Sequence, residues 1–283
     1  MNRPTWREAL AAETPLLLPV AHDALSARII ERAGFRAYSI GGFALVGTRY
    51  ALPDVGLVGL GEMSAGMRDI TAASRLPVLV DGDDGYGDVK NVTRTIRTYE
   101  EMGAAAIFIE DQTSPKRCGH MAGKSVIPAE LMAAKLRAAA AARERGIFLV
   151  ARTDARAVHG LDDALRRGEL YLKSGADGVF IEAPQTLEEL ARVGSEFRHV
   201  PQIANMIEGG RTPIIPPAEL LGMGFSMVAY PTNLLFRIVA AMQKGLAELK
   251  AGRPMTGADG VSFDDFKEIV GFPDWAQVED RAR

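Results

Sequence analysis

The sequence predicts an α/β fold of the (β/α)8, or TIM, barrel class. Eight short apolar runs of strand length alternate with stretches of helical periodicity, and the runs are continuously apolar, as is typical of parallel strands buried on both faces. Glycine also recurs where the helical stretches end. A doubly wound open sheet is the alternative fold, but the sequence shows no obvious phosphate-binding fingerprint for it.

The predicted strands are spaced so that a helix fits between neighbours. They cover 16–20 (LLLPV), 36–41 (RAYSIG), 78–81 (VLVD), 105–110 (AAIFIE), 147–151 (IFLVA), 178–182 (GVFIE), 201–205 (PQIAN) and 226–230 (SMVAY). Between them, helical periodicity is clear at 23–33, 88–102 and 128–145. Five junctions place a glycine directly before the next strand, where a left-handed residue ends a helix: Gly34, Gly103, Gly146, Gly175 and Gly224.

The chain shows no linker-like segment rich in proline or serine. We therefore expect residues 1–283 to form a single barrel domain with a C-terminal helical extension from about 232 to 283.

The composition excludes several classes of protein. The 283 residues carry 33 Lys and Arg against 36 Asp and Glu, a formal net charge of −3, so the basic excess of a nucleic-acid binder is missing. No apolar run approaches the roughly 20 residues that cross a bilayer, and the N-terminus lacks the apolar stretch of a signal peptide. A single cysteine excludes an intramolecular disulfide and favours a reducing cytoplasm.

Polar residues collect where the predicted strands end, which is where barrels of this class have their active sites. An acidic cluster follows the third strand and the fourth. Asp81 and Asp83 lie two apart in chain that we expect to be extended, so their side chains point the same way, and Glu110 faces them from the next strand. Three carboxylates repel one another unless a hard cation lies among them, which predicts Mg²⁺, with Mn²⁺ able to substitute. The alternative for the D-G-D-D-G segment is a simple turn, but Glu110 does not belong to that turn.

The only cysteine lies in a cationic segment, 115–124 (PKRCGHMAGK). Lys116, Arg117, His120 and Lys124 surround Cys118 with no acid among them, and neighbouring cations stabilise a thiolate. We expect a catalytic thiol on a loop that closes over substrate. The alternative is an inert buried cysteine, which the polar surroundings disfavour.

Two further strand ends carry weaker signals. Arg152 is either a carboxylate clamp for the substrate or an interior partner of Asp154. Gly41 and Gly42 allow the backbone to approach a ligand closely or serve only a tight turn.

From about residue 15 to 250, the sequence resembles the isocitrate lyase/phosphoenolpyruvate mutase superfamily. The motifs are P-D-V-G at 53–56, D-G-D-D-G-Y-G at 81–87, K-R-C-G-H at 116–120, A-R-T-D-A at 151–155, A-N-M-I-E-G-G at 204–210 and Y-P at 230–231. The K-R-C-G-H motif is typical of the carbon–carbon lyase branch, whereas the phosphonate mutases and hydrolases carry an Asn-containing loop without this cysteine.

The resemblance implies a Mg²⁺-dependent lyase that cleaves a 2-hydroxy di- or tricarboxylate, of the 2-methylisocitrate or 2,3-dimethylmalate type. It implies that Asp83 is the direct metal ligand, that Asp81 and Glu110 hold metal-bound water, and that Asp54 lies near the metal. Cys118 then exchanges a proton with the enolate carbon, with Lys116, Arg117 and His120 beside it. The implied substrate contacts are Arg152, Glu182, Asn205 and the backbone of Gly41 and Gly42.

The resemblance also implies a homotetramer in which a C-terminal helix is exchanged between subunits. Two residues depart from the family pattern: Gly41 stands where many members have Ser, and Asp84 brings a charge where a neutral residue is common. The alternatives to the lyase are an oxaloacetate-cleaving hydrolase of the same branch, P–C bond chemistry on phosphonopyruvate, and a barrel that binds a metabolite without turnover.

Overall fold

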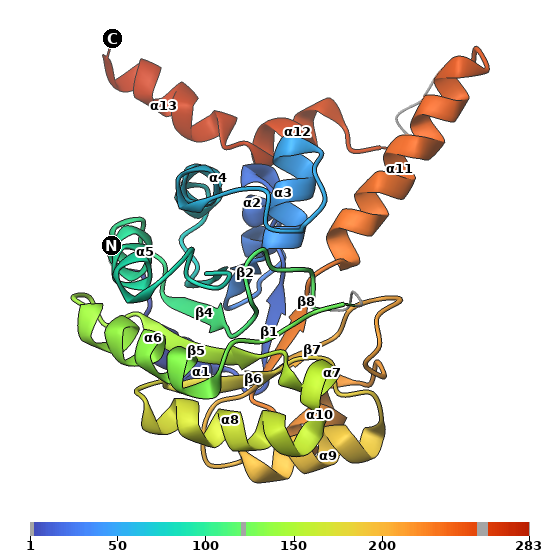
Figure 1. The fold of residues 1–283 in the computed structure, drawn as a ribbon. Helices are drawn as coiled ribbons and strands as arrows, with labels where there is room; N and C mark the ends of the chain where they lie inside the picture. The colour runs from blue at the N-terminus through green and yellow to red at the C-terminus, as the bar shows by residue number, and fades with distance from the viewer. Residues whose placement is uncertain (1–2, 120–122, 254–259, 283) are drawn as a thin grey trace. The chain divides into compact units, whose positions relative to one another are not determined.

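The computed structural model describes residues 3–119, 123–253 and 260–282 (Figure 1). The chain divides into two compact units, Met1–Asn233 and Leu234–Arg283. Eight parallel strands make up the sheet of the first unit: β1 (Leu16–Pro19), β2 (Tyr38–Ile40), β3 (Val78–Asp81), β4 (Ala106–Glu110), β5 (Phe148–Thr153), β6 (Gly178–Ile181), β7 (Ile203–Asn205) and β8 (Met227–Tyr230).

The strands close into a barrel. β2 to β6 pair in chain order, and β8 pairs with both β7 and β1. Two single bridges complete the ring, Val20 with Ser39 between β1 and β2, and Val179 with Gln202 between β6 and β7. The predicted barrel is therefore confirmed, and each predicted strand overlaps an observed one.

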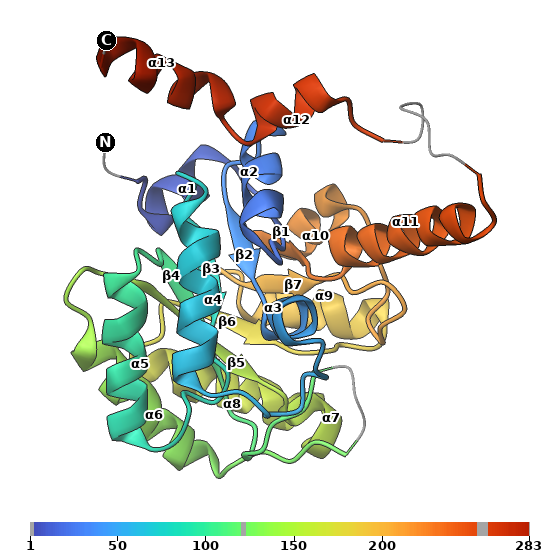
Figure 2. The same ribbon diagram turned by 90° about the horizontal axis from the view of Figure 1, so that it is seen from above.

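Helices form the outer layer of the first unit, and neighbours in this layer pack side by side around the barrel (Figures 1 and 2). They are α1 (Trp6–Ala12), α2 (Ala24–Arg32), α3 (Gly42–Tyr50), α4 (Leu60–Ala72), α5 (Val89–Glu101), α6 (Ala129–Ala142), α7 (Ala155–His159), α8 (Leu161–Lys173), α9 (Leu187–Glu196) and α10 (Pro217–Met223). The five predicted helix-ending glycines all have positive φ, between 78° and 121°. Glycine adopts this conformation without the steric cost that a Cβ brings, so α2, α5, α8 and α10 end at or next to such a glycine. The prediction is wrong for Gly146, because α6 already ends at Ala142, where Arg143 is extended, and Gly146 lies in the turn into β5.

The core explains why the strands are continuously apolar. One cluster fills the barrel and includes Leu16, Leu79, Phe108 and Phe148, with Trp6 of α1 packed against it. A second cluster lies between the sheet and the outer helices. Both faces of the strands are thus removed from water, as in other parallel sheets.

The C-terminal unit is helical. α11 (Asn233–Lys250) begins at the last residue of the first unit, and α12 (Phe263–Ile269) and α13 (Phe272–Ala282) follow. Several of its large apolar side chains are exposed, among them Leu246, Phe263 and Trp275. No helix within the described ranges is both long enough and apolar enough to cross a membrane.

Candidate active site

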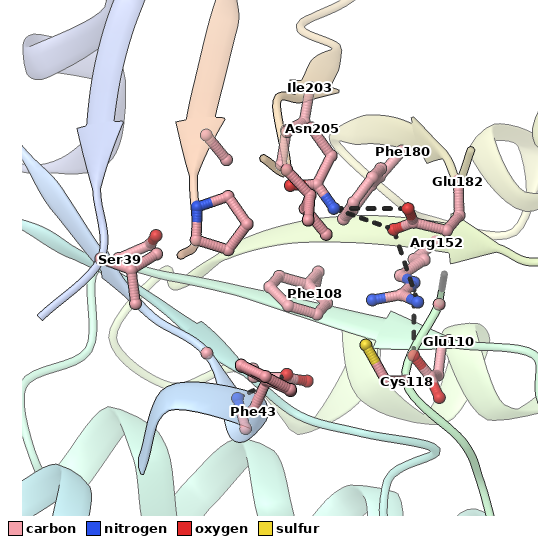
Figure 3. A pocket seen from close by; sticks show the side chains of 18 of the residues that line it. Ser39, Phe43, Phe108, Glu110, Cys118, Arg152, Phe180, Glu182, Ile203 and Asn205 are labelled. Atoms are coloured by element: carbon pink, nitrogen blue, oxygen red, sulfur yellow. Dashed lines mark hydrogen bonds and ion pairs between the residues drawn. The ribbon is translucent and has the colours of Figure 1, made fainter. Parts of the chain in front are cut away.

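A cavity lies at the carboxyl ends of the barrel strands (Figure 3). Most of the residues predicted from the sequence line it, and they come from segments far apart in the chain. These are Gly41, Gly42, Asp54, Asp81, Glu110, Lys116, Arg117, Cys118, Arg152, Glu182 and Asn205. His120 lies outside the described residues, and Asp83 lies beside the cavity, in contact with Lys116.

Asp81 ends β3, and both of its carboxylate oxygens accept backbone hydrogen bonds. Gly42 N–H donates to one over 2.9 Å and Asp83 N–H to the other over 3.0 Å. A Cβ at Gly42 would lie 3.2 Å from the carboxylate of Asp81, so only glycine leaves room for this approach. The Gly42 backbone therefore lies against Asp81, and the close approach to a ligand expected at Gly41 and Gly42 stays a prediction.

The geometry predicted for Asp83 is wrong. The sequence suggested an extended chain from Asp81 to Asp83, but Asp83 has a φ of 47°, in the left-handed region. The strand ends at Asp81, and the chain turns so that Asp83 N–H meets the Asp81 carboxylate. Glu110 does lie beside this turn as predicted, because its N–H donates to the carbonyl of Asp83 over 2.8 Å.

Lys116 compensates the acidic cluster. Its Nζ lies 2.6 Å from a carboxylate oxygen of Asp54 and 2.7 Å from one of Asp83, and the side chain is buried. The expectation of three uncompensated carboxylates was therefore wrong. This pairing could not be predicted from the sequence, because Lys116 is far from Asp54 and Asp83 in the chain and no local sequence pattern marks such a contact.

A chain of charged and polar side chains runs along one wall of the cavity (Figure 3). Asn205 Nδ2 donates to the Glu182 carboxylate over 3.2 Å, and Arg152 lies 3.4 Å from Glu182 and 3.3 Å from Glu110. Arg152 also binds both carboxylate oxygens of Asp154, at 3.0 and 3.2 Å. Arg152 is thus an interior partner of Asp154, one of the two alternatives, and this contact fixes the guanidinium at the cavity wall. The role of a substrate clamp stays a prediction.

Aromatic rings below Arg152 form part of the site that the sequence reasoning missed. Phe108 and Phe180 pack edge to face with ring centroids 5.7 Å apart, and the Arg152 guanidinium lies over both rings. Each ring lies two residues before a cavity carboxylate, Glu110 or Glu182, in the same strand or at its end. The two-residue alternation of strands was the signal that could have located them.

Cys118 lines the cavity and is half-buried, with its side chain directed inward in Figure 3. Its N–H donates to the carbonyl of Asp54 over 3.2 Å, and Gln112 exchanges two hydrogen bonds with the backbone of Arg117. The cations predicted to activate the thiol are themselves paired. Lys116 contacts Asp54 and Asp83, and Lys124 lies 2.5 Å from Asp154, so their effect on the thiol is weaker than an isolated cationic loop would give.

Gly119, next to Cys118, packs against the wall. A Cβ there would lie 2.4 Å from Arg152 Nη2 and 2.8 Å from the Glu182 side chain. The loop therefore reaches the charged wall only because residue 119 has no side chain. Gly119 thereby becomes part of the cavity lining.

The carboxylates of the site resist ionisation. Burial, followed by repulsion from Asp83, raises the pKa of Asp81 to about 6, and burial raises the pKa of Glu110 well above its usual range and that of Asp54 above its usual value. Oε1 of Glu110 is buried and has no hydrogen-bond partner among the described residues. These features fit a cation-binding site.

The described part of the chain contains no three His, Cys, Asp or Glu side chains that already converge as a metal cage. Mg²⁺ does not require one, because it keeps several waters and uses one or two protein carboxylates. Asp81, Asp83 and Glu110 are the residues that would hold it.

A closed (β/α)8 barrel with buried carboxylates, two buried cations and a thiol around one cavity defines an enzyme-type active site at the strand ends. Comparison with known proteins gives the family. A family model described as phosphoenolpyruvate phosphomutase matches residues 7–250, and the chain belongs to the phosphoenolpyruvate mutase/isocitrate lyase superfamily of enzymes.

Three proteins illustrate the similarity. The 2,3-dimethylmalate lyase of Eubacterium barkeri is 39% identical over 276 residues, covering 96% of this chain and 95% of that protein. Oxaloacetate acetylhydrolase in complex with the inhibitor 3,3-difluorooxalacetate has a TM-score of 0.93 at 29% identity, covering 98% of this chain and 95% of that one. Phosphonopyruvate hydrolase in complex with oxalate and Mg²⁺ has a TM-score of 0.85 at 28% identity, covering 98% and 99%.

Proposed function

We propose that the protein is a Mg²⁺-dependent carbon–carbon lyase that cleaves a 2-hydroxy di- or tricarboxylate to pyruvate, or a related 2-oxo acid, and a second carboxylate. The observation that carries the proposal is the placement of Cys118 on the same cavity as Asp81, Glu110 and Arg152. A thiol that can donate a proton, beside carboxylates that can hold Mg²⁺, suits a reaction that expels a carbanion and then protonates it.

The reaction breaks the C2–C3 bond of the substrate. The bonding electrons pass to C3, the C2 hydroxyl becomes a carbonyl, and its proton must leave. Mg²⁺, when bound by Asp81, Asp83 and Glu110, supplies positive charge for the oxygens at C1 and C2. We assign the hydroxyl proton to Asp54, since burial raises the pKa of this carboxyl and so favours proton uptake.

The remaining residues act on the other fragment. The Cys118 thiol donates a proton to C3 of the enolate and so completes the second carboxylate product. Lys116 and Arg117 directly precede this thiol in the chain, and we propose that they, with His120 after it, keep positive charge near the enolate. Arg152, Glu182, Asn205 and the backbone of Gly41 and Gly42 orient the substrate, and the loop excludes water while the carbanion exists.

A panel of substrates tests the proposal. With Mg²⁺ present, proton NMR should detect pyruvate and propionate from 2,3-dimethylmalate, or pyruvate and succinate from 2-methylisocitrate, with citramalate and isocitrate as further members. EDTA should abolish turnover, and Mg²⁺ or Mn²⁺ should restore it. The Cys118→Ser variant is the matched control, because it retains the metal carboxylates. Absence of any 2-oxo acid product would overturn the lyase assignment.

Oxaloacetate hydrolysis is the second candidate, favoured by the structural similarity to oxaloacetate acetylhydrolase at a TM-score of 0.93. Oxalate and acetate from oxaloacetate in the same panel would establish it. P–C bond chemistry is disfavoured by the cysteine-bearing loop, and phosphonopyruvate turnover would reverse that ranking.

We also propose a homotetramer in which a C-terminal helix is exchanged between subunits. Exposed apolar side chains such as Leu246, Phe263 and Trp275 support it, because large exposed apolar surfaces are typical of interfaces. Light scattering should give the mass of four chains. A reducing cytoplasm suits the free thiol of Cys118.

A further inference from the structure

The loop that carries Asp83 joins β3 to α5 and has a strained backbone. Gly85 and Gly87 have φ of 82° and 138°, and the non-glycine residues Asp83 and Tyr86 have φ of 47° and 59°. Left-handed conformations are unfavourable for residues with a Cβ and persist only where the surrounding structure holds them. Contacts that fix this loop therefore determine where the Asp83 carboxylate points.

Two contacts fix the backbone at Asp83 and Asp84 from different elements. Glu110 N–H, at the end of β4, donates to the carbonyl of Asp83 over 2.8 Å. Lys135 Nζ, from α6, donates to the carbonyl of Asp84 over 2.7 Å. Lys135 is 9% exposed, so its ammonium reaches the loop through the protein interior rather than through water.

The charge of Lys135 also matches the unusual acid in the loop. Asp84 is 6% exposed, and its carboxylate accepts a hydrogen bond from Tyr86 N–H over 2.8 Å. Lys135 is the strongest of the groups that favour the ionised form of Asp84 against burial. In turn, Asp84, Asp88 and Glu110 favour the charged form of Lys135, whose pKa burial lowers. A buried carboxylate is costly without such a partner.

We propose that Lys135 is a positioning residue for the acidic loop. Lys135 donates to the carbonyl of Asp84 and so holds this peptide, which keeps Asp83 in its left-handed conformation. Lys135 contacts the loop from α6, whereas Lys116 contacts the Asp83 carboxylate at the cavity. The consequence for metal binding rests on the proposed function, but the consequence for loop geometry does not.

Hydrogen–deuterium exchange of the peptide that covers 81–88 tests the geometry. Lys135→Met removes the donor, and loss of a charged hydrogen bond should raise exchange in this peptide by about tenfold or more. Arg137→Met is the matched control, since Arg137 lies on the exposed face of the same helix and exchange there should stay at the wild-type rate.

A double variant separates positioning from stability. Lys135→Met with Asp84→Asn removes the ammonium together with the buried carboxylate whose ionised form it favours, and should recover most of the thermal stability lost in Lys135→Met. The Asp84 carbonyl still lacks its donor, so exchange at 81–88 should remain fast. This variant also keeps the test valid if Lys135→Met alone does not fold.

Calorimetric titration with Mn²⁺ measures the consequence for the metal. The Kd for Mn²⁺ should rise about 10- to 100-fold in the double variant and stay unchanged in Arg137→Met. Wild-type exchange at 81–88 in both the Lys135→Met and the double variant would overturn the inference about Lys135. If the wild-type protein binds no Mn²⁺, the proposed metal chemistry fails, and the exchange data still decide on Lys135.

Discussion

Replacing Lys116 with methionine removes a buried ammonium group and keeps most of the side-chain volume. The ammonium lies 2.6 Å from Asp54 and 2.7 Å from Asp83, and Asp81 and Glu110 also stabilise its charge. Because Lys116 is only 7% exposed, water cannot take the place of the lost charge. The variant therefore leaves a group of buried carboxylates without their nearest cation.

The expected loss of stability is about 3–5 kcal/mol, the cost of removing one partner of a buried ion pair. For a chain of 283 residues, this corresponds to a fall in Tm of about 5–8 °C. The loss should depend on pH. Asp81 has a folded-state pKa of about 6, above its unfolded value, and Lys116 lowers it, so the variant raises it further. Between the unfolded and the folded pKa the folded state binds more protons, so stability falls as pH rises.

Thermal unfolding at pH 5 and pH 8, with and without Mg²⁺, measures both effects. The deficit of Lys116→Met relative to wild type should be largest at pH 8 and smaller at pH 5, and Mg²⁺ should stabilise the variant more than the wild type. Lys90→Met, on the exposed surface of α5, is the control and should change Tm little. A Lys116→Met deficit under 1 kcal/mol at pH 8, or one that grows on acidification, would refute the reasoning.

Three further predictions concern the site. Cys118→Ser should lower turnover by about 10²–10⁴-fold in steady-state kinetics and leave the Mn²⁺ affinity unchanged in calorimetry. A near wild-type rate in this variant would contradict the role of proton donor. In the wild-type protein, iodoacetamide should label Cys118 near neutral pH, and substrate should protect it. If Asp83 is the direct metal ligand and Asp81 holds a metal-bound water, as we propose, Asp83→Ala should weaken Mn²⁺ binding more than Asp81→Ala, and the reverse order in titrations would exchange the two roles. Because the pKa of Asp81 is raised to about 6, protons should compete with Mn²⁺ as pH falls from 7 to 5, and Asp81→Asn should flatten this pH dependence.

The fold could be predicted because its signals are local. Apolar runs of strand length and helix-ending glycines depend only on short segments, and the strands and four of the five glycines are where the sequence placed them. Helices α3 and α7 are among those that lacked such signals. α3 begins at Gly42 with no side-chain cap, and α7 spans only five residues, so neither produces a recognisable start or a clear period.

The sequence was sufficient to predict which residues line the site, but not which charged side chains pair with one another there. The strand ends bring Asp81, Glu110 and Arg152 together because parallel strands of a barrel share one carboxyl face. Which charges meet there depends on loop conformation. The left-handed φ of Asp83 and the reach of Lys116 to Asp54 and Asp83 arise from tertiary contacts between segments 27 to 62 residues apart.

These pairings bear on how an anionic substrate could bind. Lys116 and Arg152, the buried cations of the cavity, already contact carboxylates of the protein, and Asp54, Asp81, Glu110 and Glu182 line the same space. A dicarboxylate would add negative charge to a region where burial already raises carboxyl pKa values, so its binding alone is unfavourable. A divalent cation reverses that balance. Metal and substrate should therefore bind with positive coupling, each raising the affinity of the protein for the other by the same factor.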